Sequence, residues 1–310
     1  MAVHETQWPK LPLGQWQDTY QTLHLWSQIV GKIRLRQMPW INHSWHVPLY
    51  VTANGLTTSL VPHGAHAFQI DFDFVDHRLW ITSTDGQRLS FDLRPMSVAS
   101  FYHQIMQALG EMGLEVHILP RPVEIPDPIQ PFYEDEEHAA YDAEAVNRFW
   151  RALVPISAVF TEFRSRFIGK VSPVHFFWGA FDLAVTRFSG RTAPKHPGGA
   201  PNCADWVMVE AYSHELASVG FWPGMGLGQA AFYAYAYPEP EGFSGHSVLP
   251  DAAYYNQDLG EYILPYEAVR TAKEPEAELM QFLQSTYEAA ADLANWDRKA
   301  LERVGSIGKA

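Results

Sequence analysis

The stretch Phe167–Arg191 combines several side chains that can take part in catalysis or binding. It reads FIGKVSPVHFFWGAFDLAVTRFSGR, an apolar run that contains His175, Trp178, Asp182 and Arg187. If the run forms one long strand, a two-residue period places His175 and Arg187 on one face and Trp178 and Asp182 on the other. A carboxylate in this setting needs a hydrogen-bonded or ionic partner, because burying an isolated charge is costly. Asp182 is therefore either part of a structural ion pair or a base or anchoring group in a pocket.

The segment YSHE at 212–215 is the second candidate. Neighbouring residues of a strand point to opposite faces, so His214 and Glu215 cannot form a catalytic pair on their own. If His214 meets His175 or Asp182 from a neighbouring strand, an acid–base pair becomes possible, since imidazole titrates near neutral pH. A hydrogen-bonded core histidine is the alternative. The candidate catalytic residues are His175, Asp182, His214 and Glu215.

A metal ion or a haem is a further possibility that depends on histidines. His43 and His46, like His63 and His66, have a spacing that a loop can bend around one ion, but neither pair has a carboxylate at ligand spacing. A haem could use one histidine in an aromatic pocket, whereas covalent attachment is excluded because Cys203 is the single cysteine. We predict no metal site and no particular cofactor, and a metal- or haem-dependent enzyme stays open as a variant.

A stripe of tyrosines favours an aromatic binding pocket. Tyr233, Tyr235 and Tyr237 alternate with alanines, so a strand would present three hydroxyls on one face. Such a face can line a polar cavity or simply cover a sheet. The predicted ligand-binding residues are Trp178, Arg187, Tyr212 and Tyr235.

Two similar series of elements would position these residues. In the first half, apolar spacing and turn residues predict a helix at 16–36, strands at 45–52, 56–61, 68–74, 78–82 and 88–93, a helix at 98–112 and a short strand at 115–119. In the second half they predict a helix at 143–167, strands at 174–188, 208–210, 212–220, 231–237 and 261–264, and a helix at 276–293. Ser97 and Asp142 are expected to cap the helices that follow them.

These series predict an α+β fold made of two similar helix–antiparallel meander–helix halves, which would be an internal duplication. Ile29–Thr58 repeats the order of parts found in Phe167–Arg191. The expected division is a first half at 1–119, a Pro-rich acidic linker at 120–137 and a second half at 138–310. We expect the site in the second half, because that copy has Asp182 and Arg187 along its strand.

Composition limits the classes of partner. The 310 residues contain 22 basic and 35 acidic side chains, a net charge of 22 − 35 = −13, which disfavours nucleic acid and anionic membranes as partners. No apolar run approaches the roughly 18–20 residues of a membrane helix, and the N-terminus lacks the features of a signal peptide. With one cysteine, a reducing compartment fits best. We expect a soluble cytoplasmic protein, and the sequence does not indicate its oligomeric state.

Several longer strings together resemble one family. They include WPKLP, TLHLWSQIVGKIRL, NHSWHVPLYVTANGLTTS, RFIGKVSPVHFFWGAFDLAVTRFSGR, AFYAYAYPEPEGF and QSTYEAAADLANWDR. The resemblance extends from Trp8 to about Leu301 and is to an uncharacterised bacterial family defined as a domain of unknown function. It implies a soluble bacterial protein and assigns no catalytic residue.

Two functions are therefore open from the sequence. The first is a small-molecule-binding protein or enzyme with an aromatic-lined pocket and His, Asp, Arg and Glu side chains in the second half. The second is a structural or protein-interaction module in which the same polar residues only join the halves. Convergence of the polar side chains on one cavity would favour the first, and dispersal into separate pairs would favour the second.

Overall fold

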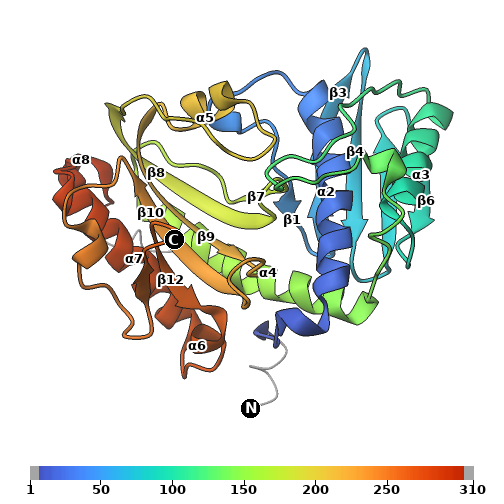
Figure 1. Cartoon of the computed structure of the whole chain (residues 1–310). Helices are drawn as coiled ribbons and strands as arrows, with labels where there is room; N and C mark the ends of the chain where they lie inside the picture. The colour runs from blue at the N-terminus through green and yellow to red at the C-terminus, as the bar shows by residue number, and fades with distance from the viewer. Residues whose placement is uncertain (1–6, 304–310) are drawn as a thin grey trace, which may run out of the picture.

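The computed structural model describes residues 7–303, and residues 1–6 and 304–310 lie outside the described part. The predicted absence of a signal peptide concerns residues that partly lie outside it. The chain forms two six-stranded antiparallel sheets, one from each half, with helices packed against them (Figure 1). This arrangement confirms the predicted α+β class.

The first sheet has the order β1-β2-β4-β5-β6, and β3 also pairs with β4. Its elements are η1 (Leu13–Gln15), α2 (Gln17–Gln37), η2 (Asn42–Ser44), β1 (Tyr50–Val51), β2 (Gly55–Thr57), β3 (Val61–His63), β4 (His66–Asp73), β5 (Arg78–Ser83), β6 (Arg88–Asp92) and α3 (Val98–Glu111). Strict alternation in β4 buries Phe68, Ile70 and Phe72 on the face that packs against α2 and α3. Phe101 of α3 stacks on Trp26 of α2 with ring centroids 4.7 Å apart. This face of the first sheet is therefore closed by helices.

The second sheet has the order β11-β12-β10-β9-β8-β7. Its elements are η3 (Phe132–Glu134), α4 (Ala143–Ser165), β7 (His175–Phe177), β8 (Asp182–Thr192), α5 (Asp205–Ala211), β9 (His214–Trp222), β10 (Ala231–Tyr237), η4 (Phe243–Gly245), β11 (Tyr254–Asn256), β12 (Glu261–Pro265), α6 (Tyr266–Arg270), α7 (Pro275–Leu293) and α8 (Arg298–Leu301). One face of this sheet packs on α4 and α7 through fully buried side chains such as Leu183, Val185 and Phe221. The other face carries no layer of long helices (Figure 1).

The helix caps agree with the sequence. The side-chain oxygen of Ser97 accepts a hydrogen bond from the backbone N–H of Ser100, and Asp142 accepts one from Ala145. Each cap satisfies a backbone donor that has no partner within the helix.

The prediction of one long strand at 174–188 is wrong. Phe181 has a positive φ of 58° and lies in a tight turn that separates β7 from β8. The two strands pair as a hairpin in which Phe177 is opposite Asp182 and His175 is opposite Ala184. Because opposed residues share a face, His175 lies on the same face as Asp182, and Arg187 lies on the other.

Three other predicted strands also differ. Residues 208–210 belong to helix α5, and residues 115–119 form neither helix nor strand. The strand expected at 45–52 is reduced to Tyr50–Val51, because His43 and Ser44 adopt left-handed conformations with φ of 57° and hold a short 3-10 turn before it. A short apolar run does not by itself distinguish strand, helix and loop.

The two sheets meet at one edge. The backbone N–H of Leu49 donates to Phe176 O, and the N–H of Phe176 donates to Leu49 O, both at 2.9 Å. Each sheet is preceded and followed by a helix, as an internal duplication requires, and the duplication and the division at 120–137 stay predictions. Among residues 7–303, no helix is both long enough and apolar enough to cross a membrane.

Candidate functional site

The open face of the second sheet is polar. The strand register puts Gly220 opposite Tyr233 and Ser218 opposite Tyr235, and Ser218 is also opposite Thr186. The residues on this face that carry polar side chains include Asp182, Thr186, Ser218, Tyr233, Tyr235 and Glu261, together with His175, Tyr237 and Asn256. Glu261 belongs to this set because the next residue, Tyr262, pairs with the core-facing Ala234.

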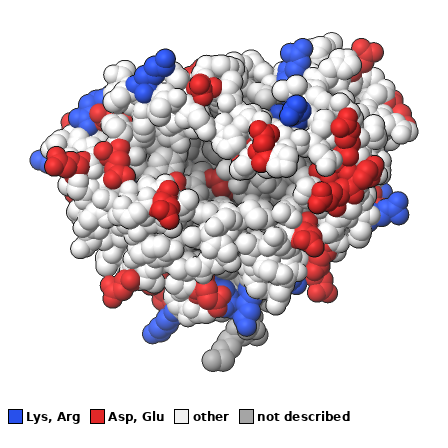
Figure 2. Space-filling view, viewed as in Figure 1, with Lys and Arg blue, Asp and Glu red and all other residues white. Residues whose placement is uncertain are grey.

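A hollow opens above this face. Figure 2 shows it between the second sheet and α5, with an acidic side chain at its floor. The loop between β8 and α5 rises from the second sheet (Figure 1), and the backbone N–H of Glu124 donates to Pro201 O of this loop at 2.7 Å. We call this space the acidic hollow.

Asp182 and Tyr233 form the central contact of the acidic hollow. The Tyr233 hydroxyl donates a hydrogen bond to Oδ2 of Asp182, whose residue is 6% exposed. Burial raises the pKa of Asp182 to about 7, the hydrogen bond from Tyr233 lowers it, and the charge of Glu124 raises it further. Gly220 makes room for the Tyr233 ring, because a Cβ at that position would collide with it. Asp182 can therefore gain or lose a proton near neutral pH.

Glu261 is a second carboxyl of the same kind. Burial raises the pKa of Glu261 to about 7, and the charge of Asp182 adds to the rise. None of the ion pairs among the described residues involves Asp182, Glu261 or Glu124. The hollow thus concentrates carboxyls without a paired cation, and a bound cation would favour their ionised forms.

Glu124 adds a third carboxyl from the Pro-rich segment. Its backbone has a positive φ of 58°, and its carboxylate packs against Gly179, where a Cβ would collide with Oε1. The Glu124 side chain reaches solvent although protein surrounds it on most sides, as expected at the border of a concavity. Burial raises the pKa of Glu124, and the charge of Lys32 opposes this.

Gln28 of α2 holds the residue before Glu124. Its Oε1 accepts a hydrogen bond of 2.9 Å from Val123 N–H, and its Nε2 donates one of 2.8 Å to Val123 O. Gln28 is fully buried and Val123 is half-buried. Both main-chain hydrogen-bonding groups of Val123 are thereby satisfied, and Glu124 is held beside the hollow.

Tyrosine hydroxyls extend from the carboxyls. Tyr235 and Tyr212 place their hydroxyl oxygens 2.9 Å apart, and the Tyr212 ring stacks on His196 with centroids 4.5 Å apart. Burial raises the pKa of Tyr212 to about 12 and that of Tyr235 well above its ordinary value, so both stay protonated at neutral pH. One hydroxyl donates to the other, so the pair keeps one hydroxyl proton that a ligand near the carboxyls could accept.

Lys32 and Trp178 lie behind this arrangement. Burial lowers the pKa of Lys32 to about 8, while the charges of Cys203 and Glu124 raise it, and its Nζ lies 5.9 Å from the centre of the Trp178 ring. The Trp178 indole donates to Val47 O at 2.9 Å and packs against Gly31. Trp178 therefore joins the two halves.

Two of the candidate residues, His175 and Arg187, are buried among aromatic rings. His175 is fully buried between Trp45 and Tyr50, neither ring nitrogen has a partner among the described residues, and burial lowers its pKa to about 3. Arg187 is 1% exposed on the opposite face of the sheet, with its Cζ 3.4 Å from the centre of the Phe163 ring. His175 is therefore neutral, and Arg187 does not reach the hollow.

His214 and Glu215 lie at the far end of β8 from Asp182. Asp182 pairs with Phe177 at the start of β8, whereas His214 pairs with Thr192 at its end. The carboxylate of Glu215 forms an ion pair of 2.7 Å with Arg191. The structure does not bring His214 to Asp182 or join it to Glu215.

The histidine pairs point to separate partners. His43 Nε2 lies 2.7 Å from Lys170 Nζ, while His46 contacts the backbone of Ile41. His63 Nδ1 lies 3.3 Å from the side-chain oxygen of Gln37, and His66 is exposed. Within residues 7–303, no group of three His, Cys, Asp or Glu side chains is arranged to hold a metal ion.

The sequence did not single out Glu124 or Glu261. It named Tyr233 in the tyrosine stripe but not in the predicted ligand-binding set. Tyr233 had a signal in the tyrosine alternation. Glu261 could be placed opposite Tyr235 only once the order β10-β12 was known. Glu124 had no signal, because an irregular segment has no period from which a facing direction follows.

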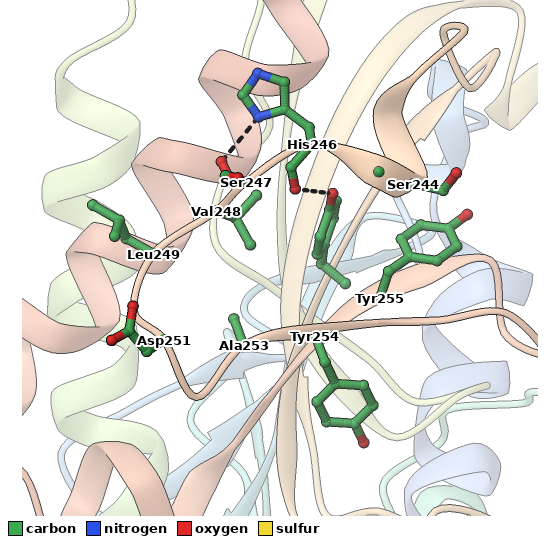
Figure 3. A pocket seen from close by; sticks show the side chains of 11 residues that line it. Ser244, His246, Ser247, Val248, Leu249, Asp251, Ala253, Tyr254 and Tyr255 are labelled. Carbon is green, nitrogen blue, oxygen red and sulfur yellow. Dashed lines mark hydrogen bonds between the residues drawn. The ribbon is translucent and has the colours of Figure 1, made fainter.

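A separate recess lies beyond β11, next to α7 (Figure 3). It has a volume of about 420 Å³, and one carboxylate, Asp251, lines it. The hydroxyl of Tyr262 already donates to His246 O at 2.6 Å, and His246 Nδ1 lies 2.9 Å from Ser247 O. This recess holds one carboxylate, whereas in the acidic hollow the charges of Glu124 and Asp182 act on neighbouring carboxyls, so we place the candidate site in the hollow.

The fold and the hollow together define an α+β protein with a buried carboxyl–tyrosine cluster on the open face of one sheet. The chain belongs to the family of unknown function DUF5996, whose profile matches residues 8–303. Among curated proteins and among solved structures, no match to the chain is found. The family relation carries no activity, so function must be argued from the hollow itself.

Proposed function

We propose that the chain binds a small organic molecule with a basic group in the acidic hollow. The observation that carries this proposal is that the carboxyls of Asp182 and Glu261 lie in the hollow without a cationic partner. A bound ammonium or guanidinium group would stabilise their ionised forms and offset the cost of burying the charge. The hydroxyls of Tyr212 and Tyr235 would orient the rest of the molecule.

The same carboxyls suit acid–base chemistry on a bound molecule. A general acid or base is most effective when its pKa lies near the working pH, and both Asp182 and Glu261 have a pKa of about 7. The charge of Asp182 raises the pKa of Glu261, so ionising Asp182 makes Glu261 harder to ionise. Binding and proton transfer would then use one set of residues.

The test compares matched probes. We expect benzylamine to bind the wild-type protein more tightly than benzyl alcohol, because only the amine is positively charged. Asp182→Asn should abolish this preference, while Glu215→Gln, a carboxyl that lies outside the hollow, should leave it unchanged. Isothermal titration calorimetry measures all six combinations of probe and protein. Equal binding of the two probes, or equal affinity of the amine for wild type and Asp182→Asn, would contradict the proposal.

A further inference from the structure

The segment Ala193–Ser213 leaves the second sheet and returns to it at one point. The N–H of Ala193 donates to Ser213 O at 3.0 Å, directly beside the pair of Thr192 with His214. Between these ends the segment passes over the acidic hollow and includes α5 (Figure 1). We call it the lid segment. A long excursion with adjacent ends can move about its base without changing the sheet.

The lid segment contacts the body of the molecule mostly through exposed or half-buried groups, which include hydrogen-bond contacts of Pro194 O with Tyr237 and of Ala211 O with His43. Helix α5 has no buried residue. Trp206 of α5 is 57% exposed and packs on Trp40, which is 43% exposed, with ring centroids 4.9 Å apart. Trp40 also donates to Oε1 of Glu210 at 2.8 Å, in an exposed position. Because few apolar contacts are buried, separating these parts exposes little additional apolar surface.

The tip of the lid segment is fastened to the opposite border of the hollow. Glu124 N–H donates to Pro201 O at 2.7 Å, and the side-chain amide of Asn202 donates to Ile125 O at 2.9 Å. These two hydrogen bonds join segments that are far apart in sequence, and the second is exposed to solvent. We call them the latch. Because water replaces such a bond when it breaks, losing one bond of the latch shifts an opening equilibrium by about tenfold or less.

The inner side of the lid segment completes the hollow. Tyr212 bonds to Tyr235 of the sheet, and His196 stacks on Tyr212. Cys203 lies next to the latch, close enough for its thiol to interact electrostatically with Glu124 and Lys32. Movement of the lid segment would therefore separate the two tyrosines and expose the thiol.

We propose that the lid segment opens about its base at Ala193 and Ser213, by breaking the latch, to admit the ligand to the acidic hollow. The proposal rests on the proposed function for the role of the opening. The opening itself is a property of the free protein and is measured without any ligand. Failure of the lid and failure of the ligand site are thus distinguishable.

The native thiol of Cys203 reports the opening, because it is the single cysteine of the chain. Labelling of the folded wild-type protein by a thiol reagent should be slower than labelling of the unfolded protein. Asn202→Gly removes the latch amide, and glycine tolerates the φ of 52° found there. We expect the labelling rate of this variant to rise about three- to tenfold, the effect of losing one hydrogen bond.

Asn295→Gly is the matched control. Asn295 is also exposed and has a φ of 54°, but it lies outside the lid segment, so its labelling rate should equal that of the wild type. Amide hydrogen exchange gives a second measurement, and Asn202→Gly should accelerate exchange in residues 193–213 while leaving β9 unchanged. The proposal is overturned if wild-type Cys203 labels as fast as in the unfolded protein, or if Asn202→Gly labels and exchanges like the wild type.

Discussion

Buried ionisable side chains have different surroundings on the two faces of the second sheet. Arg187 on the helix-covered face is surrounded by aromatic rings, with its Cζ 3.4 Å from the centre of Phe163 and 4.3 Å from that of Tyr287. It also donates to Phe163 O near the end of α4. Asp182 begins the same strand on the opposite face and has a neutral tyrosine as its hydrogen-bond partner. The cation is held by aromatic faces and one carbonyl oxygen, with its Nε left without a hydrogen-bond partner among the described residues, whereas the carboxyl faces a hollow.

This difference separates structural from functional charge. Burial lowers the pKa of Arg187 to about 9, so the guanidinium is still charged at neutral pH and holds α4 and α7 on the sheet. Burial raises the pKa of Asp182 to about 7, so the fold leaves that group between its two protonation states. A buried side chain whose pKa lies near neutral pH is a candidate for proton transfer or for ligand binding.

The largest expected effect comes from the helix-covered face. Arg187→Ala should reduce the free energy of unfolding by about 3–5 kcal/mol, because it empties a buried space and removes the contacts with Phe163 and Tyr287. Urea denaturation measures this. Arg191→Ala, which removes an exposed ion pair, should cost less than about 1 kcal/mol. If the two variants lose similar amounts of unfolding free energy, Arg187 is no more structural than an exposed arginine, and the contrast between the two faces is contradicted.

The next effect depends on pH and comes from the hollow. Asp182 has a pKa of about 7 when folded and near 4 when unfolded, so the folded state binds more protons between these values. Wild-type stability should therefore fall as pH rises from about 4 to 7 and level off above. Asp182→Asn should be more stable than the wild type at pH 8 by about 1–4 kcal/mol, with a smaller gain at pH 5. A variant whose advantage grows on acidification would contradict this assignment.

Gln28 tests how the fold positions the hollow. Gln28→Leu leaves the N–H and C=O of Val123 without their partner, which should cost about 1–3 kcal/mol in the free energy of unfolding. Because Glu124 is then released, amine binding should weaken as well. Gln28→Glu keeps an acceptor for the Val123 N–H and should retain more of the affinity. If Gln28→Leu lowers stability but binds the amine like the wild type, Glu124 is not part of the site.

Gly179 gives the smallest expected effect on stability. In Gly179→Ala the new Cβ meets the end of the flexible Glu124 side chain, which can swing away, so the cost should stay below about 1 kcal/mol. The displaced carboxylate should nevertheless reduce amine affinity, which calorimetry measures. Gly14→Ala is the control, because its Cβ meets no atom within 4 Å. Unchanged affinity in Gly179→Ala would place Glu124 outside the binding surface.

The sequence predicted the elements that have a clear period. The 16–36 helix appears as Gln17–Gln37, the Phe68–Phe74 alternation appears in His66–Asp73, and both Ser97 and Asp142 cap their helices. Prediction failed at 174–188, where a turn at Phe181 interrupts the apolar pattern without an Asn-Gly signal. Local patterns thus sufficed for elements and not for the turn that orients Asp182.

The candidate site could be predicted in part. Asp182, Tyr212 and Tyr235 were chosen from the sequence and belong to the hollow proposed as the site, whereas Trp178 bonds to Val47 of the first half. His175, Arg187, His214 and Glu215 have the same chemical character but lie elsewhere, because strand phase and strand order decide which side chains meet. Glu124 and Glu261 arrive from distant segments, so their contribution depends on tertiary contacts that no local spacing encodes.

The most direct test of the account is the titration of Asp182 itself. Carbon-13 NMR of the side-chain carboxyl, assigned by its loss in Asp182→Asn, follows the protonation of this residue in the free protein. We expect a midpoint near pH 7, as burial in the hollow requires, and a lower midpoint when benzylamine is bound. A midpoint near pH 4 in the free protein would show an ordinary solvated carboxylate and would contradict the account.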